Sequence, residues 1–270
     1  MLIDTHCHLD SSRFDADRDA VIKRALAADV RHIVIPAVNP DNFQAVADLA
    51  DRVPGGAYAL GIHPMCVPDA SEADLELLDE ALEARRDDTR LVAVGEIGLD
   101  FFIPELKTDH AVRKQEAFYL AQLRIARRHG LPVILHVRRS QDRILKYLRQ
   151  QPGIEGVAHA FNGSMQQAHS FIDLGIKLGA GGAMTYERSR QIRRLGAQIP
   201  LSNWVLETDA PDIPPAWLSS KTDQPPRNEP AEVAGVARTL ASLKNMALAD
   251  VITQTGQNAS RLFGLSSTTQ

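Results

Sequence analysis

The sequence predicts an α/β protein in the form of a single (β/α)8 TIM barrel. Eight short runs rich in Val, Ile, Leu and Ala alternate with amphipathic stretches along the chain. Most of the runs are apolar on both faces, as expected of parallel strands that helices cover. The length of 270 residues suits this fold, which commonly takes about 250 residues. No composition break marks a domain boundary, so we expect one barrel domain over residues 1–270.

The apolar runs predict the strands in chain order. They cover 2–8, 32–38, 57–63, 91–99, 132–137, 156–161, 176–182 and 204–210. The amphipathic stretches predict helices over 13–28, 40–52, 71–87, 108–129, 140–150, 164–174 and 188–197, with 229–239 and 247–263 as closing helices. Start signals support two of these helices, since Asp41 follows Pro40 and Asp74 lies three residues after Ser71. The proline-rich stretch 211–230 is interpreted as a long loop at the top of the barrel.

Charge and cysteine content narrow the function classes. The chain has 30 basic and 34 acidic side chains, a formal charge of −4, so no global positive field is available to gather nucleic acid. Cys7 and Cys66 form no CxxC pair, which favours a reducing compartment without disulfides. The start MLIDTHCHLD lacks the apolar run of a signal peptide, and no stretch approaches 18 apolar residues. We expect a cytoplasmic protein with no membrane contact and no obligate protein partner.

Polar residues interrupt the apolar strands close to their C-terminal ends. They are His6, His8, His63, Glu96, His136, His159 and Asp209. In a (β/α)8 barrel these ends converge on the face where active sites are built, so residues far apart in sequence meet there. A strand has a side-chain period of two, so His6 and His8 project from one face and Cys7 points toward the helices.

This combination of side chains indicates a metal site. A lone HxH pair is weak evidence, but here it is joined by two further strand-end histidines and two carboxylates. Imidazole and carboxylate together suit zinc, manganese or iron, whereas magnesium prefers oxygen, so the ligands do not determine the metal. Six candidate ligands exceed what one tetrahedral catalytic site uses. The sequence therefore predicts two divalent ions.

At these residues the sequence resembles the TatD family of metal-dependent hydrolases, within the amidohydrolase-like barrels. The details GAGGAMTY at 179–186 and DAPDIP at 209–214 are most similar to the YjjV-type branch of that family. The resemblance covers nearly the whole chain, through the motifs DTHCHLD (4–10), GIHP (61–64), VGEIGLD (94–100), RKQEAFYLAQLRIA (113–126), LPVILHVR (131–138), AHAFNGS (158–164), ETDAP (207–211) and RNEP (227–230).

The resemblance implies a ligand assignment and an activity. His6, His8, Glu96 and Asp209 would hold the first metal, and Glu96, His136 and His159 the second, with Glu96 as the bridge. The metals would be Mg²⁺, Mn²⁺ or Zn²⁺, and Asp209 would also act as general base toward a metal-activated water. The implied activity is phosphodiester hydrolysis by 3′ to 5′ trimming of DNA ends.

Five further residues are candidate substrate contacts. Arg138 reaches the same mouth and its guanidinium suits a phosphate. Phe161 is either a stacking platform for a base or part of the barrel core. Ser164 opens a helix, so backbone amides around it could cradle a phosphate. His63 is expected to contact substrate or transfer a proton rather than bind metal, and Asn228 supports either Asp209 or its loop.

Two departures from the family pattern leave a second function open. Phe101 to Pro104 remove polar groups from the lip of the site, and Asp212 replaces the usual aromatic residue after ETDAP. The alternative is hydrolysis of a small ester, lactone, amide or phosphomonoester, and a third class is a metal-binding scaffold without catalysis. The arginine-rich segment 186–194 is either a local phosphate-binding patch or the solvated face of a helix.

Overall fold

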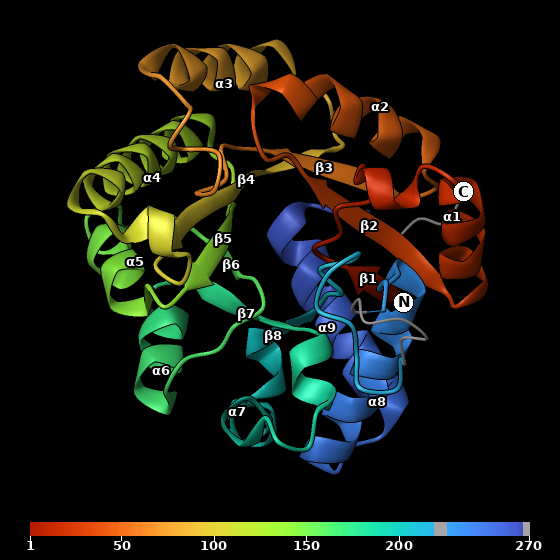
Figure 1. The fold of residues 1–270 in the computed structure, drawn as a ribbon. Coiled ribbons are helices and arrows are strands. Elements are labelled where there is room, and N and C mark those ends of the chain that lie inside the picture. Colours follow the sequence, from red (N-terminus) through yellow and green to blue (C-terminus); the bar gives the residue numbers. More distant parts are fainter. Residues whose placement is uncertain (219–225, 267–270) are drawn as a thin grey trace.

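The computed structural model describes residues 1–218 and 226–266, so part of the predicted loop 211–230 lies outside the described residues. In this part of the chain eight parallel strands form one sheet in sequence order, and the helices surround it (Figure 1). Backbone bonds from Thr5 N to Leu206 O (3.0 Å) and from His8 N to Ala210 O (2.8 Å) join the last strand to the first. The sheet is thus a closed barrel, and the predicted (β/α)8 fold is confirmed.

The observed elements follow the predicted order. The strands are β1 (Leu2–Asp4), β2 (Val30–Pro36), β3 (Gly56–Leu60), β4 (Leu91–Asp100), β5 (Val133–Arg138), β6 (Gly156–Ala158), β7 (Ile176–Ala180) and β8 (Trp204–Leu206). The helices are α1 (Arg18–Ala27), α2 (Phe43–Arg52), α3 (Glu72–Ala84), α4 (Asp109–His129), α5 (Gln141–Leu148), α6 (Met165–Asp173), α7 (Arg190–Gln198), α8 (Val233–Lys244) and α9 (Leu248–Phe263). Short 3-10 turns span Ser12–Phe14, Pro40–Asn42, Pro104–Lys107, Gly182–Thr185, Leu201–Asn203 and Pro230–Glu232.

Several predicted strands are longer than the observed ones. β1 ends at Asp4, before the two histidines that were predicted to close it, and the His6 N–H donates to the Asp4 carboxylate instead of to a neighbouring strand. Cys7 nevertheless forms an isolated bridge with Ala210 and is fully buried, so the alternation around it persists. The predicted cap at Ser71 is confirmed, since its N–H donates to Asp74 Oδ2 at 2.6 Å.

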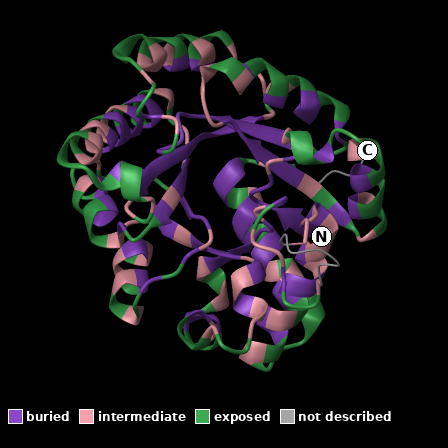
Figure 2. Ribbon diagram, in the orientation of Figure 1, coloured by how far each residue is buried: buried purple, intermediate pink, exposed green. Residues whose placement is uncertain are grey.

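Alternation along the strands separates two apolar layers. On β2, Ile33 and Ile35 pack outward with the helices, whereas Val34 belongs to the cluster that fills the lower barrel interior. β8 repeats the pattern, with Trp204 and Leu206 outside and Val205 inside. The strands are accordingly almost wholly buried, and exposed residues gather on the outer faces of the helices (Figure 2).

Helix α9 closes the bottom of the barrel. Its residues Ala259, Leu262 and Phe263 join the interior cluster of the strands, and the helix is seen through the ring in Figure 1. Asn258, 4 % exposed, ties α9 to the start of β8 because its Nδ2 donates to Leu201 O (3.0 Å) and Trp204 O (2.8 Å). Within residues 1–218 and 226–266, no helix has the length and apolar character that crossing a bilayer requires.

We expect Asn258→Ala to lower the free energy of unfolding by about 1–3 kcal/mol, because the buried Trp204 carbonyl and the partly buried Leu201 carbonyl lose their donor. Urea denaturation of the two proteins measures the difference. Gln257→Ala, at an exposed position of the same helix, is the control and should change stability little. Equal stability of Asn258→Ala and the parent would show that α9 is held by its apolar face alone.

Candidate metal centre

The strand alternation that builds the core also directs the polar side chains. On β5 the inward position after Ile134 is His136, and on β6 and its continuation the inward position after Val157 is His159. On β8 the inward series runs from Val205 to Glu207 and Asp209. A period of two therefore brings these side chains to the upper interior of the barrel, directly above the apolar layer.

Glu96, on β4 and 1 % exposed, lies at the centre of this group. Its Oε2 is 3.1 Å from His6 Nε2 and 3.4 Å from His8 Nε2, and both of these nitrogens face Asp209 Oδ1 at 3.4 and 3.7 Å. Its Oε1 is 2.7 Å from His136 Nδ1 and 2.9 Å from His159 Nε2. One carboxylate thus divides the cluster into two sets of donors, one at each oxygen.

The hydrogen bonds within this cluster do not satisfy all of its nitrogen and oxygen atoms, and a divalent cation would. His6 Nε2 and His8 Nε2 lie only 3.2 Å apart, and both face carboxylate oxygens. Among the described residues Glu96 Oε2 accepts no well-formed hydrogen bond, although it is buried. Buried oxygen and imidazole lone pairs that converge without enough protons between them are the arrangement that a bound cation satisfies.

Burial and proximity shift the pKa values in the cluster. Burial lowers the pKa of His6 to about 3. Burial opposes the charge of Glu96, but the His159, His63 and His6 imidazoles outweigh it and hold the pKa of Glu96 well below its usual range. Contacts with Glu96 outweigh burial and raise the pKa of His8 to about 9 and that of His159 to about 10, so these two imidazoles carry protons that a bound cation would displace.

His63 joins the same cluster. Its Nε2 lies 3.3 Å from Glu96 Oε1 and 3.1 Å from His136 Nδ1, as close as the predicted ligands. Its Nδ1 faces the Met65 N–H at 3.1 Å, and a nitrogen that accepts this bond leaves the ring proton on Nε2. In that tautomer His63 presents a proton to the centre rather than a lone pair.

Asp100, at the end of β4, is a site residue that the sequence reasoning missed. It is fully buried, and its Oδ2 lies 3.2 Å from His136 Nε2 while Oδ1 accepts the N–H groups of Phe102 and Ile103. A carboxylate on the far nitrogen of an imidazole orients the ring and makes it a stronger ligand. The signal was present in the sequence, because Asp100 ends the VGEIGLD motif.

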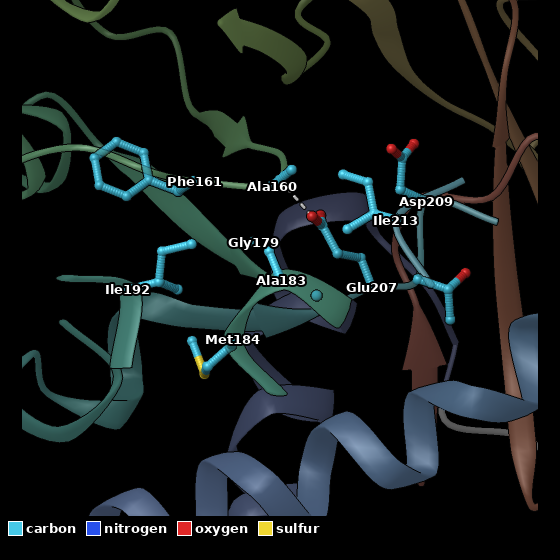
Figure 3. A pocket seen from close by; sticks show the side chains of 11 residues that line it. Ala160, Phe161, Gly179, Ala183, Met184, Ile192, Glu207, Asp209 and Ile213 are labelled. Atoms are coloured by element: carbon cyan, nitrogen blue, oxygen red, sulfur yellow. Dashed lines mark hydrogen bonds between the residues drawn. The ribbon is translucent and has the colours of Figure 1, made fainter. Parts of the chain in front are cut away.

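Glu207 is a second missed residue. It is fully buried, its Oε1 accepts the Ala160 N–H, and burial raises its pKa to about 8. Figure 3 shows it beside Asp209 in a pocket of about 10 Å³, close to the least space that one water needs. Gly179 makes room for it, since a Cβ there would lie 2.2 Å from Glu207 Oε2.

The remaining predicted substrate contacts differ in accessibility. Arg138 is exposed at the mouth, with Nη1 3.7 Å from Asp100 Oδ2. Phe161 is 1 % exposed and packs edge-on against Phe171, which favours its core role. The Ser164 N–H and hydroxyl are engaged with Gln167 in a capping box.

Asn228 supports the loop after β8. It is 1 % exposed, and its Nδ2 donates to Thr208 O, Asp212 O and Ile213 O at 2.8, 2.9 and 3.2 Å. Of the two roles left open for it, these bonds favour holding the loop that carries Asp209. Asp212 in the same loop is paired with Arg13 at 2.8 Å, which offsets its negative charge at the rim.

The arginines of segment 186–194 lie on the surface around the start of α7. Arg188 stacks on Tyr186 at 5.1 Å, Arg193 donates to Met184 O, and Arg194 donates to Gln198 Oε1. These bonds stay within the segment and its immediate neighbours. They favour the interpretation of a solvated helix face.

A (β/α)8 barrel that gathers imidazoles and carboxylates at its strand ends defines the class of metal-dependent barrel hydrolases. The family model described as TatD related DNase matches residues 3–264, and the chain belongs to this TatD family. The chain is 39 % identical over 264 residues to the uncharacterized metal-dependent hydrolase YjjV of Escherichia coli, covering 97 % of this chain and 98 % of that protein. The crystal structure of YjjV, described as a TatD homolog, superposes with a TM-score of 0.89 at 38 % identity, covering 98 % of both chains.

A human relative carries a more specific name. The chain is 32 % identical over 269 residues to deoxyribonuclease TATDN3, covering 97 % of this chain and 94 % of that protein. The family and the class of metal-dependent hydrolase predicted from the motifs are thereby confirmed.

Gly179→Ala is expected to lower the free energy of unfolding by about 1–3 kcal/mol, because its Cβ would overlap the Glu207 carboxylate. Thermal or urea unfolding measures the loss. Gly181→Ala is the matched control, since its Cβ would make only ordinary contacts with Glu207, at 3.5 Å. In a Glu207→Ala background the cost of Gly179→Ala should largely disappear, and an unchanged cost there would refute the steric explanation.

A network of ion pairs joins the RNEP motif to α1. Arg227 Nη1 and Nη2 donate to the two Asp17 oxygens at 2.6 and 2.8 Å, and Arg227 Nη2 also reaches Glu229 Oε1 at 2.8 Å. Arg24 donates to Glu229 Oε2 at 2.7 Å and to Asp17 Oδ2 at 3.1 Å. The hydrogen bonds from Arg227 lower the pKa of Asp17 to about 2.

This shift predicts an acid dependence of stability. The folded pKa of Asp17 lies below its ordinary value of 3.8, so its contribution is present above about pH 4 and is lost as the pH falls toward 2. The free energy of unfolding, measured with urea at several pH values, should fall less steeply between pH 4 and 2 in Asp17→Asn than in the parent. Asp87→Asn, at an exposed carboxylate, should keep the parent slope. Parallel curves for Asp17→Asn and the parent would contradict the assignment.

Proposed function

We propose that the protein is a 3′ to 5′ exodeoxyribonuclease that acts on DNA ends through two divalent metal ions, with residues 1–270 acting as one domain. The observation that carries this proposal is the division of donors around Glu96, with His6 and His8 at one oxygen and His136 and His159 at the other. With imidazoles at each of its two oxygens, Glu96 would help to hold two divalent cations, which would supply Lewis acidity to the reaction. The deoxyribonuclease name of the human relative supports DNA as the substrate.

The assignment gives each residue a role. His6, His8, Glu96 and Asp209 would hold one ion, and Glu96, His136 and His159 the other, with Mg²⁺, Mn²⁺ or Zn²⁺ as candidates. The ions supply Lewis acidity, which polarises a phosphoryl oxygen and acidifies water. Asp100 holds the His136 ring from behind, so that Nδ1 faces the centre.

The chain's own residues move the protons. Asp209 accepts a proton from the attacking water while the oxygen of that water forms a bond to phosphorus. The bond from phosphorus to the 3′-oxygen breaks, and His63 Nε2 donates its proton to the departing 3′-oxygen. The products are a 5′-mononucleotide and a shortened strand with a free 3′-hydroxyl. Arg138, exposed at the mouth, is available to bind a phosphate of the strand.

A second candidate function has support from charge. The formal charge of −4 disfavours a long polyanion and so favours a smaller substrate, such as an ester, lactone, amide or phosphomonoester. The same centre would serve both reactions. Substrate comparison therefore separates the two candidates, while site variants alone do not.

We expect release of mononucleotides from a labelled single strand in the presence of Mg²⁺, Mn²⁺ or Zn²⁺, and loss of that release in chelator. His6→Ala and Asp209→Asn should lower the rate by about a thousandfold or more, because both groups act in the transition state. His169→Ala, at an exposed histidine of α6, is the control and should keep the parent rate. Metal analysis of each variant provides a readout that does not depend on turnover.

Two outcomes would overturn the proposal. Parent activity in Asp209→Asn would remove the proposed base. Turnover confined to a panel of small esters and phosphomonoesters, with none on the labelled strand, would replace the exonuclease with the second candidate.

A further inference from the structure

An aromatic ring with two guanidinium groups forms the lip of the site beside β4 and β5. Phe102 is 42 % exposed, and the Cζ atoms of Arg138 and Arg139 lie 3.9 and 4.7 Å from the centroid of its ring. Both distances are within the range of cation–π contacts. One exposed ring at the mouth therefore contacts both guanidinium groups.

The backbone of this lip is anchored on both sides. Asp100 Oδ1 accepts the Phe102 N–H at 2.7 Å, and Phe101 N donates to Arg138 O at 2.8 Å, so β4 and β5 stay paired up to the lip. Arg139 has φ 55°, a left-handed conformation that few residues other than glycine adopt. Ser140 next to it donates to Leu99 O at 2.7 Å, which ties this turn to β4. The two arginines thus stand on a built turn rather than on a free loop.

Little negative charge faces this pair. Asp100 Oδ2 is 3.7 Å from Arg138 Nη1, but the same carboxylate also serves His136 and two backbone N–H groups. Among the residues that the structure describes, no carboxylate oxygen lies within 4.0 Å of the Arg139 guanidinium. The lip has an excess of positive charge although the whole chain is acidic.

The lip is also adjacent to the metal centre. Asp100 Oδ2 contacts His136 Nε2 at 3.2 Å on one side and Arg138 on the other, so a single side chain separates the candidate ligand from the arginine pair. A substrate phosphate at the centre would leave the arginine pair facing the neighbouring part of the substrate. Only a substrate with more than one phosphate can use both positions.

We propose that Arg138 and Arg139, held by Phe102, form an anion subsite for a second phosphate of the polynucleotide chain, next to the phosphate at the metal centre. Phe102 is a positioning residue, which acts through the two guanidinium groups. The subsite rests on the proposed nuclease function. It adds a determinant of substrate choice, because it favours a strand over a mononucleotide or a small ester. A guanidinium is suited to a phosphodiester, since it binds oxygen in a planar fork and is weakly hydrated.

Binding without turnover tests the subsite. The probe is a short fluorescein-labelled single strand of thymidines, added to the metal-loaded Asp209→Asn protein, and the readout is anisotropy at several salt concentrations. Added to this background, Arg139→Ala should weaken binding about 5- to 20-fold and lower the slope of log affinity against log salt by about 0.7, the value for one phosphate contact on a single strand. Unlabelled thymidine monophosphate, as competitor, should bind both proteins alike.

Variants of the ring separate positioning from simple packing. Phe102→Leu should weaken binding of the strand several-fold, and Phe102→Tyr, which keeps the ring, should restore it. Arg149→Ala is the control, since Arg149 is exposed at the far end of α5, and it should bind as the background protein does.

Three results would overturn the subsite. They are an unchanged affinity and salt slope in Arg139→Ala, an equal loss in Arg149→Ala, and an equal loss of thymidine monophosphate binding in Arg139→Ala. Each is independent of whether the parent protein cuts the strand, so failure of the subsite is distinguishable from failure of the proposed function.

Discussion

A buried carboxylate among imidazoles is the constraint on which this structure depends. Removing a charge from water costs several kcal/mol, and the charge persists only where partners replace the solvent. For Glu96 those partners come from the ends of β1, β3, β5 and β6, so the charge is stable only if the barrel closes and its strand ends converge. The site therefore depends on the fold, because the charge of Glu96 is stabilised only when the surrounding strands form a closed barrel.

Much of this arrangement is predictable from the sequence. The alternation of apolar runs and amphipathic stretches indicates the barrel, and the same period of two that places Ile134 and Val157 inside also places His136 and His159 above them. The HxH pair illustrates how robust this logic is. β1 ends before His6, yet His6 and His8 still lie on one side with Cys7 on the other.

What the sequence does not show is which side chain supports which. Asp100 and Glu207 belong to motifs that are visible in the sequence, but their contacts with His136 and Ala160 depend on the packing of neighbouring strands. The role of Gly179 is equally hidden, since it depends on the 2.2 Å that a Cβ would leave to Glu207. From the sequence, Phe102 was expected only to remove polar groups from the lip of the site. Its contact with the Arg139 guanidinium depends on a left-handed turn at Arg139, which composition does not predict.

The junction between β1 and β8 has a consequence for biosynthesis. Thr5 and Leu206 bond across 201 positions of sequence, and Asn258 of α9 bonds to Trp204 O of β8. A nascent chain that has not yet made these segments presents β1 as an open strand edge, with its apolar interior accessible from below. Until Thr5 and Leu206 pair, the incomplete chain is exposed to association through this strand edge.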